Sequence, residues 1–233
     1  MLIALHGKKG HGKSTIAAHL AARHGFSRMR FAAGLKELLG PALFQMTPAQ
    51  TDGFLKEAAC VDLFAHDAGA LAEETMELLP PGHASRYGLA DEDARARWSR
   101  VHAPLCGSCR LHTPREVMQA VGGGARRLIS ERIWIDLWRD AYRASGAGRV
   151  VVDDLRYPDE KAAIEELGGE VWRSVRTDLP ACPDTDPSET ACDHLEDGCF
   201  AAALRRDGSV SALLAQVDSL VAIRLATARA EAS

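Results

Sequence analysis

The sequence lacks several features that would place the protein in a specialised class. No apolar run approaches the roughly 20 residues of a membrane-spanning helix, and the apolar residues before Gly7 are too few for a signal peptide. The net charge is only −4, and there is no long basic stripe with interleaved aromatic residues, so we expect no direct binding to nucleic acid. Internal repeats and low-complexity segments are also absent. These absences favour a globular protein of the cytoplasm, where the six cysteines would stay reduced.

The hydrophobic pattern alternates between strand-like and helix-like stretches, which is typical of an α/β fold with a parallel sheet flanked by helices. The chain has 233 residues, of which 46% are hydrophobic, and this suits one large domain that carries an insertion. We expect residues 1–45 and 113–233 to form the core of the domain. Residues 46–112 break the alternation and are predicted to be a mostly helical insertion.

The pattern also predicts individual elements. Strands are predicted at residues 2–5, 29–32, 150–154, 170–175 and 200–204, and helices at residues 15–22, 54–64, 68–79, 133–142, 158–167 and from 210 onward. A helix that begins at Leu35 should be interrupted by Gly40–Pro41, because proline breaks a helix interior. Another should begin with Thr113 as its N-cap and Pro114 at its first position, and end at Gly122–Gly124.

A glycine-rich segment follows the first predicted strand. Residues 5–15 read LHGKKGHGKST, in which residues 7–14 fit the pattern G-x-x-x-x-G-K-[ST] of a phosphate-binding loop, or Walker A motif. Glycines let the backbone approach a ligand closely, and successive N–H groups at the start of a helix bind anions. Lys13 could reach the terminal phosphates of a nucleotide, and the Ser14 hydroxyl could bind Mg²⁺. The alternative is a glycine-rich turn that only starts a helix. The expected nucleotide contacts are Gly7, Lys9, Gly10, His11, Gly12, Lys13, Ser14 and Thr15.

Two acids and a set of arginines could complete such a site. Asp153 and Asp154 end an apolar strand, where a carboxylate could hold the magnesium shell or activate an acceptor; a helix cap or a surface acid is the alternative. Arginine binds phosphate oxygens bidentately and keeps its charge. Arginines flank the predicted strand ends and helix starts at positions 115, 126, 127, 156, 173 and 176, and as a set they indicate an anion-binding cleft.

Four blocks of the sequence carry a resemblance to a known family. They are residues 7–14, the segment FAAGLK at 31–36, the segment REVMQ at 115–119 with Arg126 and Arg127, and the segment DLRYPDE at 154–160 with Gly168, Gly169, Arg176, Ser188 and Glu189. On these blocks the chain resembles the deoxynucleoside monophosphate kinases of tailed bacteriophages, a branch of the nucleoside-monophosphate kinase group. The resemblance covers most of residues 1–40 and 113–220. The fourth block is the most specific to the family.

The resemblance implies transfer of the γ-phosphate of ATP, with Mg²⁺, to a deoxynucleoside 5′-monophosphate in the cytoplasm, that of an infected bacterial host if the gene is viral. Lys13 and Ser14 would hold the triphosphate and magnesium. The acceptor pocket would take Lys36, Arg115, Gln119, one of Arg126 or Arg127, and Asp153. Asp154 and Arg156 would lie at the junction of the two substrates, and Arg176 would belong to a lid at about residues 177–193. Beyond the monophosphate, a second copy of the chain is an open option as a partner.

The remaining alternatives concern zinc and the reaction class. His102, Cys106, Cys109 and His112 have the spacing H-x₃-C-x₂-C-x₂-H, so a structural Zn²⁺ site stands beside the simpler interpretation of reduced thiols and surface histidines. Two other functions stay open: a kinase of another phosphorylated small molecule, of the coenzyme-precursor type, and a nucleotide-switched assembly ATPase. Phosphorylation of nucleic-acid ends is disfavoured by the missing basic stripe.

Overall fold

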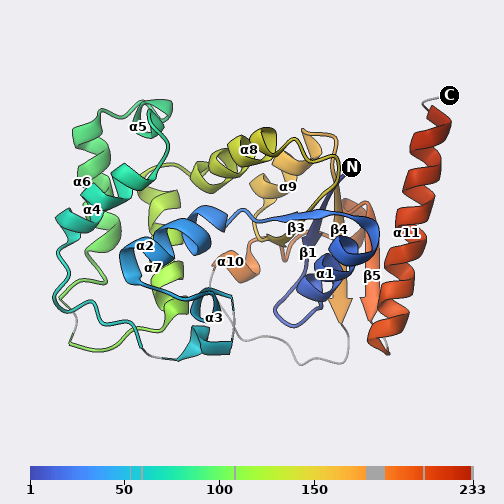
Figure 1. Ribbon diagram of the computed structural model, residues 1–233, viewed down its shortest axis with the longest axis horizontal. Coiled ribbons are helices and arrows are strands. Elements are labelled where there is room, and N and C mark those ends of the chain that lie inside the picture. The colour runs from blue at the N-terminus through green and yellow to red at the C-terminus, as the bar shows by residue number, and fades with distance from the viewer. Residues whose placement is uncertain (53, 59, 108, 177–186, 207, 232–233) are drawn as a thin grey trace. The chain divides into compact units, whose positions relative to one another are not determined.

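The apolar strands pair into one parallel sheet of five strands, in the order β2-β3-β1-β4-β5 (Figure 1). Their bounds are β1 (Leu2–His6), β2 (Ser27–Met29), β3 (Val150–Leu155), β4 (Glu170–Arg176) and β5 (Ala202–Arg206). Every pairing is parallel. β1 and β3 are buried along almost their whole length, as the continuous apolar runs of a parallel sheet require. The α/β prediction is confirmed.

The computed structural model describes residues 1–52, 54–58, 60–107, 109–176, 187–206 and 208–231. The chain divides into two compact units. Unit 1 comprises residues 1–31 and 141–233, and unit 2 comprises residues 32–140. The predicted insertion, residues 46–112, falls inside unit 2 together with the helix that follows it. Its status as an insertion into a kinase core stays a prediction.

Helices cover both faces of the sheet in unit 1. They are α1 (Lys13–His24), α9 (Pro158–Glu165), the short α10 (Pro187–Thr190) and η3 (Asp197–Cys199), and α11 (Val210–Glu231). Ile3 and Leu5 of β1 share one buried cluster with residues of α1 and α11. The opposite face packs against α9, where a Cβ added to Gly169 would lie 2.8 Å from Leu2 Cγ and 2.7 Å from Ile164 Cγ2. The sheet is therefore the middle of three layers.

The strand order places the end of β1 at a change of direction in the sheet. From β1 the chain passes to β2 and β3 on one side, and then to β4 and β5 on the other side of β1. In open parallel sheets, ligands bind outside the carboxyl ends of the strands at such a switch point. The glycine-rich loop leaves β1 at this position.

The second strand is shorter and earlier in the chain than the sequence predicts. It spans residues 27–29 instead of 29–32. The backbone N–H of Phe31 donates to the Asp154 side chain (3.0 Å), so by that residue the chain bonds to a carboxylate and not to the ladder. The pattern of apolar residues alone does not reveal this exchange of partners.

Unit 2 is built from helices around its own core. They are η1 (Gly34–Leu39), α2 (Gly40–Phe44), α3 (Pro48–Thr51), η2 (Phe54–Glu57), α4 (Ala68–Leu78), α5 (His83–Arg86), α6 (Asp91–His102), α7 (Pro114–Leu128) and α8 (Ile133–Ser145), whose last residues belong to unit 1. Leu39, Trp98 and Val121 lie fully or almost fully buried in the cluster that these helices share. Three predictions for this region are wrong. The helical turn from Gly34 continues through Gly40–Pro41 to Phe44, because Pro41 stands at the start of α2, where a missing N–H is tolerated.

The predicted helix at 54–64 is the second error. Only residues 54–57 form a 3₁₀ turn. Val61 instead makes an antiparallel bridge with His112, in which the two backbones exchange hydrogen bonds of 2.9 and 2.8 Å. Val61 and Leu63 are therefore buried from an extended part of the chain, whereas Leu55 and Phe64 are exposed.

Helix α7 runs through the glycines that were expected to end it. Its N-terminus is as predicted, with Thr113 as N-cap in a capping box. A Cβ on Gly122 would lie 3.1 Å from Leu35 Cδ2, and a Cβ on Gly124 would lie 3.1 Å from Val101 Cγ1. The glycines therefore let α7 approach η1 and α6 closely, and the helix continues because burial of its apolar face compensates for their low helix propensity.

Helix α11 is long and apolar enough to span a membrane by length and composition alone. Within the described ranges it is the one helix that departs from the expectation that no segment approaches that length. A helix that packs on a sheet passes the same test, and Leu213, Val217 and Val221 of α11 are buried in the core of unit 1. The helix is therefore weak evidence for a membrane.

The close approach at Gly124 predicts a difference between neighbouring positions. Gly124→Leu should lower the free energy of unfolding by about 1–3 kcal/mol, because the side chain must displace Val101. The matched control is Gly123→Leu, whose Cβ meets only the flexible Arg127 side chain, at 3.5 Å. It should leave stability unchanged or raise it by about 0.5–1 kcal/mol through helix propensity. Chemical denaturation measures both; equal effects would contradict the packing role of Gly124.

Candidate nucleotide-binding site

The glycine-rich loop joins β1 to α1 and has a backbone that only glycine can adopt at three positions. Gly7, Gly10 and Gly12 have φ values of 151°, 85° and 89°. A Cβ built on Gly7 would overlap the carbonyl oxygen of Ser174 in β4. The loop thus lies directly against the end of the neighbouring strand. This leaves its backbone open to a ligand and starts α1 directly after Gly12.

Lys13 folds back over this loop. Its side chain is buried, and its Nζ donates to the carbonyl oxygens of Gly7 and Lys8, the second at 3.0 Å. Burial, and next the charge of Arg156, lower the pKa of Lys13 to about 7, although nearby carboxylates oppose the shift. An anion in the loop would stabilise the charged ammonium group, so the site is electrostatically suited to phosphate.

Arg156 and Glu189 form a buried ion pair beside the loop. Arg156 Nη1 donates to Glu189 Oε2 (2.5 Å), and the Glu189 side chain is almost fully buried. Lys8 of the loop donates to the backbone oxygen of Glu189 (2.6 Å) and to the carboxylate of Asp193. The segment that follows the undescribed residues 177–186 is thereby attached to the loop through Lys8 and to the end of β3 through Arg156.

The two acids at the end of β3 have different environments. Asp153 is buried and is held by Arg28 (2.6 Å) and Arg30 (3.4 Å). Asp154 is half-buried and accepts the backbone N–H of Phe31 (3.0 Å). Both carboxylates act on the charge of Lys13, so both lie near the loop. Because Asp153 is neutralised by two arginines, Asp154 is the better candidate for a role with metal or acceptor.

The remaining predicted contacts of the loop divide by exposure. Lys9, Gly10, Ser14 and Thr15 are exposed, as groups that receive a ligand must be. His11 is half-buried: its Nδ1 lies 3.0 Å from Ser174 O, and its carbonyl oxygen accepts the Ser174 hydroxyl (2.5 Å). Burial lowers the pKa of His11, which makes the neutral ring its form at pH 7. His11 therefore fixes the loop to β4 more than it supplies charge.

The predicted lid falls mainly outside the described residues. Arg176 is the last residue of β4 and is half-buried there. Residues 177–186 of the lid are not described, and residues 187–190 form α10. A role for Arg176 in closure stays a prediction.

The predicted acceptor residues lie in unit 2, except Asp153, which belongs to unit 1. Lys36 pairs with Asp52 (2.9 Å), and Arg115 lies 3.5 Å from Glu57. Gln119 and Arg126 follow Arg115 on one face of α7, at spacings of one and about three helical turns. Arg127 is exposed and lies outside that face. This alignment favours Arg126 over Arg127 as the fourth member of the set.

The zinc prediction finds no support. In the described part of the chain, His102, Cys106, Cys109 and His112 do not bring three ligand atoms within 4.8 Å of one another. His102 is fully buried in α6, where its Nε2 bonds to the Thr75 hydroxyl (2.9 Å) and its ring stacks on Trp98. His112 lies in the bridge to Val61. The histidines are core residues, and their spacing to the cysteines does not produce a site.

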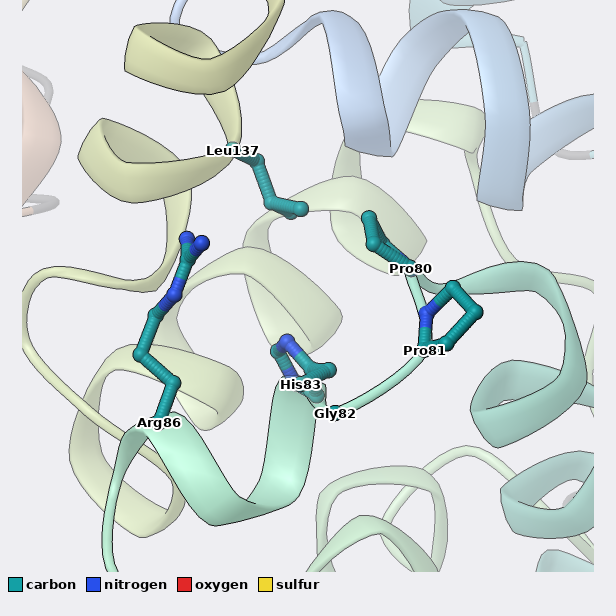
Figure 2. Close-up of a pocket in the computed structure, with 6 residues that line it drawn as sticks. All are labelled: Pro80, Pro81, Gly82, His83, Arg86 and Leu137. Carbon is teal, nitrogen blue, oxygen red and sulfur yellow. The ribbon is translucent and has the colours of Figure 1, made fainter.

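A hollow in unit 2 also falls outside the predicted site. It is lined by Pro80, Pro81, Gly82, His83, Arg86 and Leu137 (Figure 2). Arg86 is paired with Asp140 (2.7 Å), and burial lowers the pKa of His83 to about 4. Among its lining residues the arginine is therefore already paired with a carboxylate and the histidine ring is neutral at pH 7, which makes the hollow a poor site for a phosphate.

Sequence reasoning missed three residues of the site. Glu189 and Lys8 were included only within larger blocks and given no role, and Ser174 was not noticed at all. Glu189 and Ser174 lie far from residues 7–13 in sequence, and only β4 and the segment after it bring them to the loop. No local signal singles out Glu189, because the same polar segment also contains Asp178, Asp184, Asp186 and Asp193.

The overlap at Gly7 can be tested against a second glycine with positive φ. Gly7→Ala should abolish nucleotide binding. It should also lower the free energy of unfolding by at least about 1–3 kcal/mol, because the backbone strain and the overlap of the new Cβ with Ser174 both destabilise the fold. Gly25→Ala, at φ 69° with nothing within 4 Å of its Cβ, should cost only about 1–2 kcal/mol and keep binding. Fluorescent ATP binding and thermal unfolding measure both. Retained binding in Gly7→Ala would contradict the close approach.

Comparison with known proteins gives one informative likeness. No family model matches the chain. A curated protein of Acanthamoeba polyphaga mimivirus, named "Putative deoxynucleotide monophosphate kinase", is 29% identical to it over 203 residues. The aligned region covers 81% of this chain and 80% of the viral protein. The likeness extends over both units and supports, at a distant level, a relationship to the nucleotide kinases.

Proposed function

We propose that the chain is an ATP-dependent kinase of a deoxynucleoside 5′-monophosphate. The observation that carries the proposal is the loop from Gly7 to Lys13, where three glycines with positive φ shape the backbone before α1 and burial lowers the pKa of Lys13 to about 7. Its position at the switch point of the sheet agrees with nucleotide binding. The distant relationship to a protein named as a deoxynucleotide monophosphate kinase supports the reaction class.

The residues around the loop fit a magnesium nucleotide. Ser14 offers an exposed hydroxyl at the first turn of α1, and Asp154 offers a half-buried carboxylate at the end of β3. Both donors are oxygens, the ligands that Mg²⁺ prefers. Mg²⁺, when bound, neutralises charge on the phosphates during transfer. Gly10, Gly12 and the first N–H groups of α1 would bind phosphate oxygens.

Two cations of this chain would act on the transferring phosphoryl group. Lys13 would bind the terminal phosphates of ATP, after leaving the carbonyl oxygens of Gly7 and Lys8 to which it now donates. Arg156 would stabilise the charge that spreads over the oxygens in the transition state. The buried Glu189 carboxylate orients the Arg156 guanidinium before the substrate binds. Such preorganisation lowers the reorganisation needed at the moment of transfer.

The acceptor monophosphate would bind to basic residues of unit 2. Lys36, Arg115 and Arg126, with the amide of Gln119, provide three positive charges and a hydrogen-bonding side chain. Asp52 and Glu57, which pair with Lys36 and Arg115 in the described state, would be displaced by the phosphate. Arg176 would contribute to closure, and exclusion of water would suppress hydrolysis of ATP.

The kinase assay is the primary test. ADP release is measured with ATP and Mg²⁺ over a panel of ribo- and deoxynucleoside monophosphates, including modified pyrimidines. Lys13→Ala and Arg156→Ala should each lower acceptor-dependent kcat by about 10²–10³-fold, since each removes one transition-state charge contact. The matched control is Arg95→Ala, a surface arginine of α6 that pairs only with an exposed glutamate, and it should keep full activity.

The outcomes separate the alternatives. ADP release that depends on a deoxynucleoside monophosphate supports the proposal and identifies the base. ADP release that depends only on another phosphorylated small molecule would identify a different acceptor, and the role of the loop in ATP binding would still stand. Release indifferent to every acceptor would contradict the proposal and favour an assembly ATPase.

The lowered pKa of Lys13 predicts a proton linkage in ATP binding. In the free chain Lys13 is mainly neutral above pH 7, and a bound phosphate favours its charged form. Binding of metal-free ATP at pH 8 should therefore take up close to one proton, and affinity should fall as the pH rises from 7 to 9. Calorimetry in buffers of different ionisation enthalpy measures the uptake.

Lys13→Arg provides the control, because its guanidinium is charged at every pH used. It should bind ATP with no proton uptake at pH 8. His6 and His11 add little, because burial lowers both pKa values and their rings are already neutral. Equal uptake in the wild type and in Lys13→Arg would exclude Lys13 as the source.

A further inference from the structure

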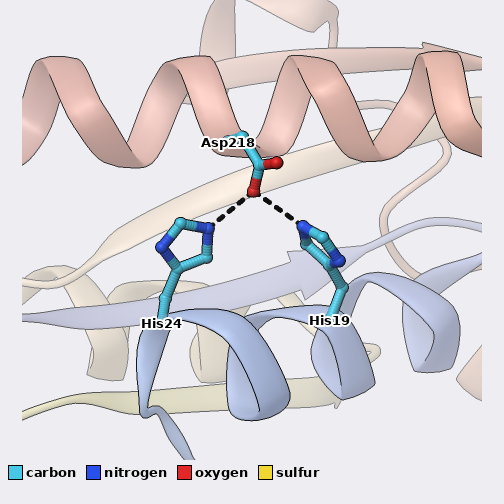
Figure 3. A group of neighbouring side chains, drawn as sticks. All are labelled: His19, His24 and Asp218. Atoms are coloured by element: carbon cyan, nitrogen blue, oxygen red, sulfur yellow. Dashed lines mark hydrogen bonds and ion pairs between the residues drawn. The ribbon is translucent and has the colours of Figure 1, made fainter.

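Two histidines and an aspartate converge in unit 1 on the outer side of α1. His19 Nε2 and His24 Nε2 each lie 2.7 Å from the same oxygen, Asp218 Oδ1 (Figure 3). The ligand atoms of the three residues all lie within 4.8 Å of one another. The kinase proposal uses none of these three residues.

The elements that carry the three side chains are held firmly together. His19 and His24 stand on α1, and Asp218 projects from α11 toward them (Figure 3). The two helices share a buried cluster that includes Leu20 and Val217, each next to one of the converging residues. The backbone of His24 is fixed as well, since its carbonyl oxygen accepts Arg149 Nη1 (2.8 Å). The convergence is therefore a property of the packed core.

We propose that His19, His24 and Asp218 form a binding site for a divalent transition-metal ion of the Zn²⁺ type. Two imidazole nitrogens and one carboxylate oxygen are a donor set that Zn²⁺ prefers, with water completing the coordination. A tetrahedral zinc with bonds of about 2.1 Å separates its ligands by about 3.4 Å. Each N···O distance would thus open by less than about 1 Å, a movement that the half-buried Asp218 side chain can make.

Arg23 sets the orientation of the carboxylate. Its Nε lies 3.2 Å from Asp218 Oδ2, the oxygen that faces away from the histidines. This ion pair leaves Oδ1 to the two imidazoles and supplies an outer partner of the kind that ligating carboxylates commonly have. The Arg23 side chain is 65% exposed, so solvent screens its repulsion of a bound cation.

A bound ion would clamp the C-terminal end of α1 to α11. The N-terminus of α1 carries the glycine loop, about 16 Å from His24 along the helix axis. The ion would therefore be structural, lying on the same helix as the nucleotide site but separate from it. This inference does not rest on the proposed kinase activity.

The test is a metal titration of the intact chain after removal of metal by a chelator. Calorimetry with Zn²⁺ should give one equivalent of binding, and thermal unfolding should shift to higher temperature with Zn²⁺. Asp218→Asn and His24→Gln should each weaken Kd by about 100-fold or more, because even an outer partner of a metal ligand contributes about 10–100-fold. His66→Gln, an exposed histidine of unit 2, is the matched control and should bind as the wild type does.

A Co²⁺ spectrum distinguishes this site from the cysteines. Ligation by nitrogen and oxygen alone gives no thiolate-to-metal charge-transfer band, and the wild type should show none at one equivalent. Asp218→Asn keeps the size of the side chain, so circular dichroism should show that this variant is folded. No binding at all, or binding that persists in Asp218→Asn, or a thiolate band at one equivalent, would each overturn the proposal.

Discussion

The contact between Gly7 and the Ser174 carbonyl oxygen is the constraint on which the candidate site depends. It brings the end of β1 against the end of β4 with no room for a side chain, and the hydrogen bonds between His11 and Ser174 hold the loop there. With the loop fixed, α1 starts directly after Gly12 and Lys13 has only the loop interior to occupy. The absence of a Cβ atom at Gly7 thereby influences the path of the backbone, the start of α1 and the burial of the Lys13 side chain.

That burial explains the ion pairs around the loop. A buried charge is costly unless it is paired, and here several charges of both signs share one end of a sheet. Glu189 neutralises Arg156, and Asp153 is neutralised by Arg28 and Arg30. Lys13 is left with carbonyl oxygens, which accept its protons without carrying a full charge. The described residues at the sheet end therefore form a balanced network with one weakly compensated cation, an arrangement that an anion completes.

The sequence predicts correctly the elements that are specified by residues adjacent in the chain. The apolar run before Gly7, the Thr113 N-cap and the strand that begins at Val150 all follow from adjacent residues, and the structure has each of them. The errors occurred where a distant contact decided the outcome. The glycines of α7 looked like a helix end because Leu35 and Val101, which fill the space beside them, lie elsewhere in the chain. His102 looked like a ligand because its partner Thr75 cannot be inferred from spacing.

The strand order has a consequence for how the chain acquires its structure. β3 lies between β1 and β2, yet residues 32–140 separate it from both in sequence. During synthesis the first two strands leave the ribosome with no partner and cannot pair with each other. The central ladder forms only after residue 155 has emerged, and β4 and β5 are added later still. Unit 2 has a buried cluster of its own and can collapse in the meantime, which shortens the effective distance between the halves of unit 1. High contact order then makes closure of the sheet the slow step of folding.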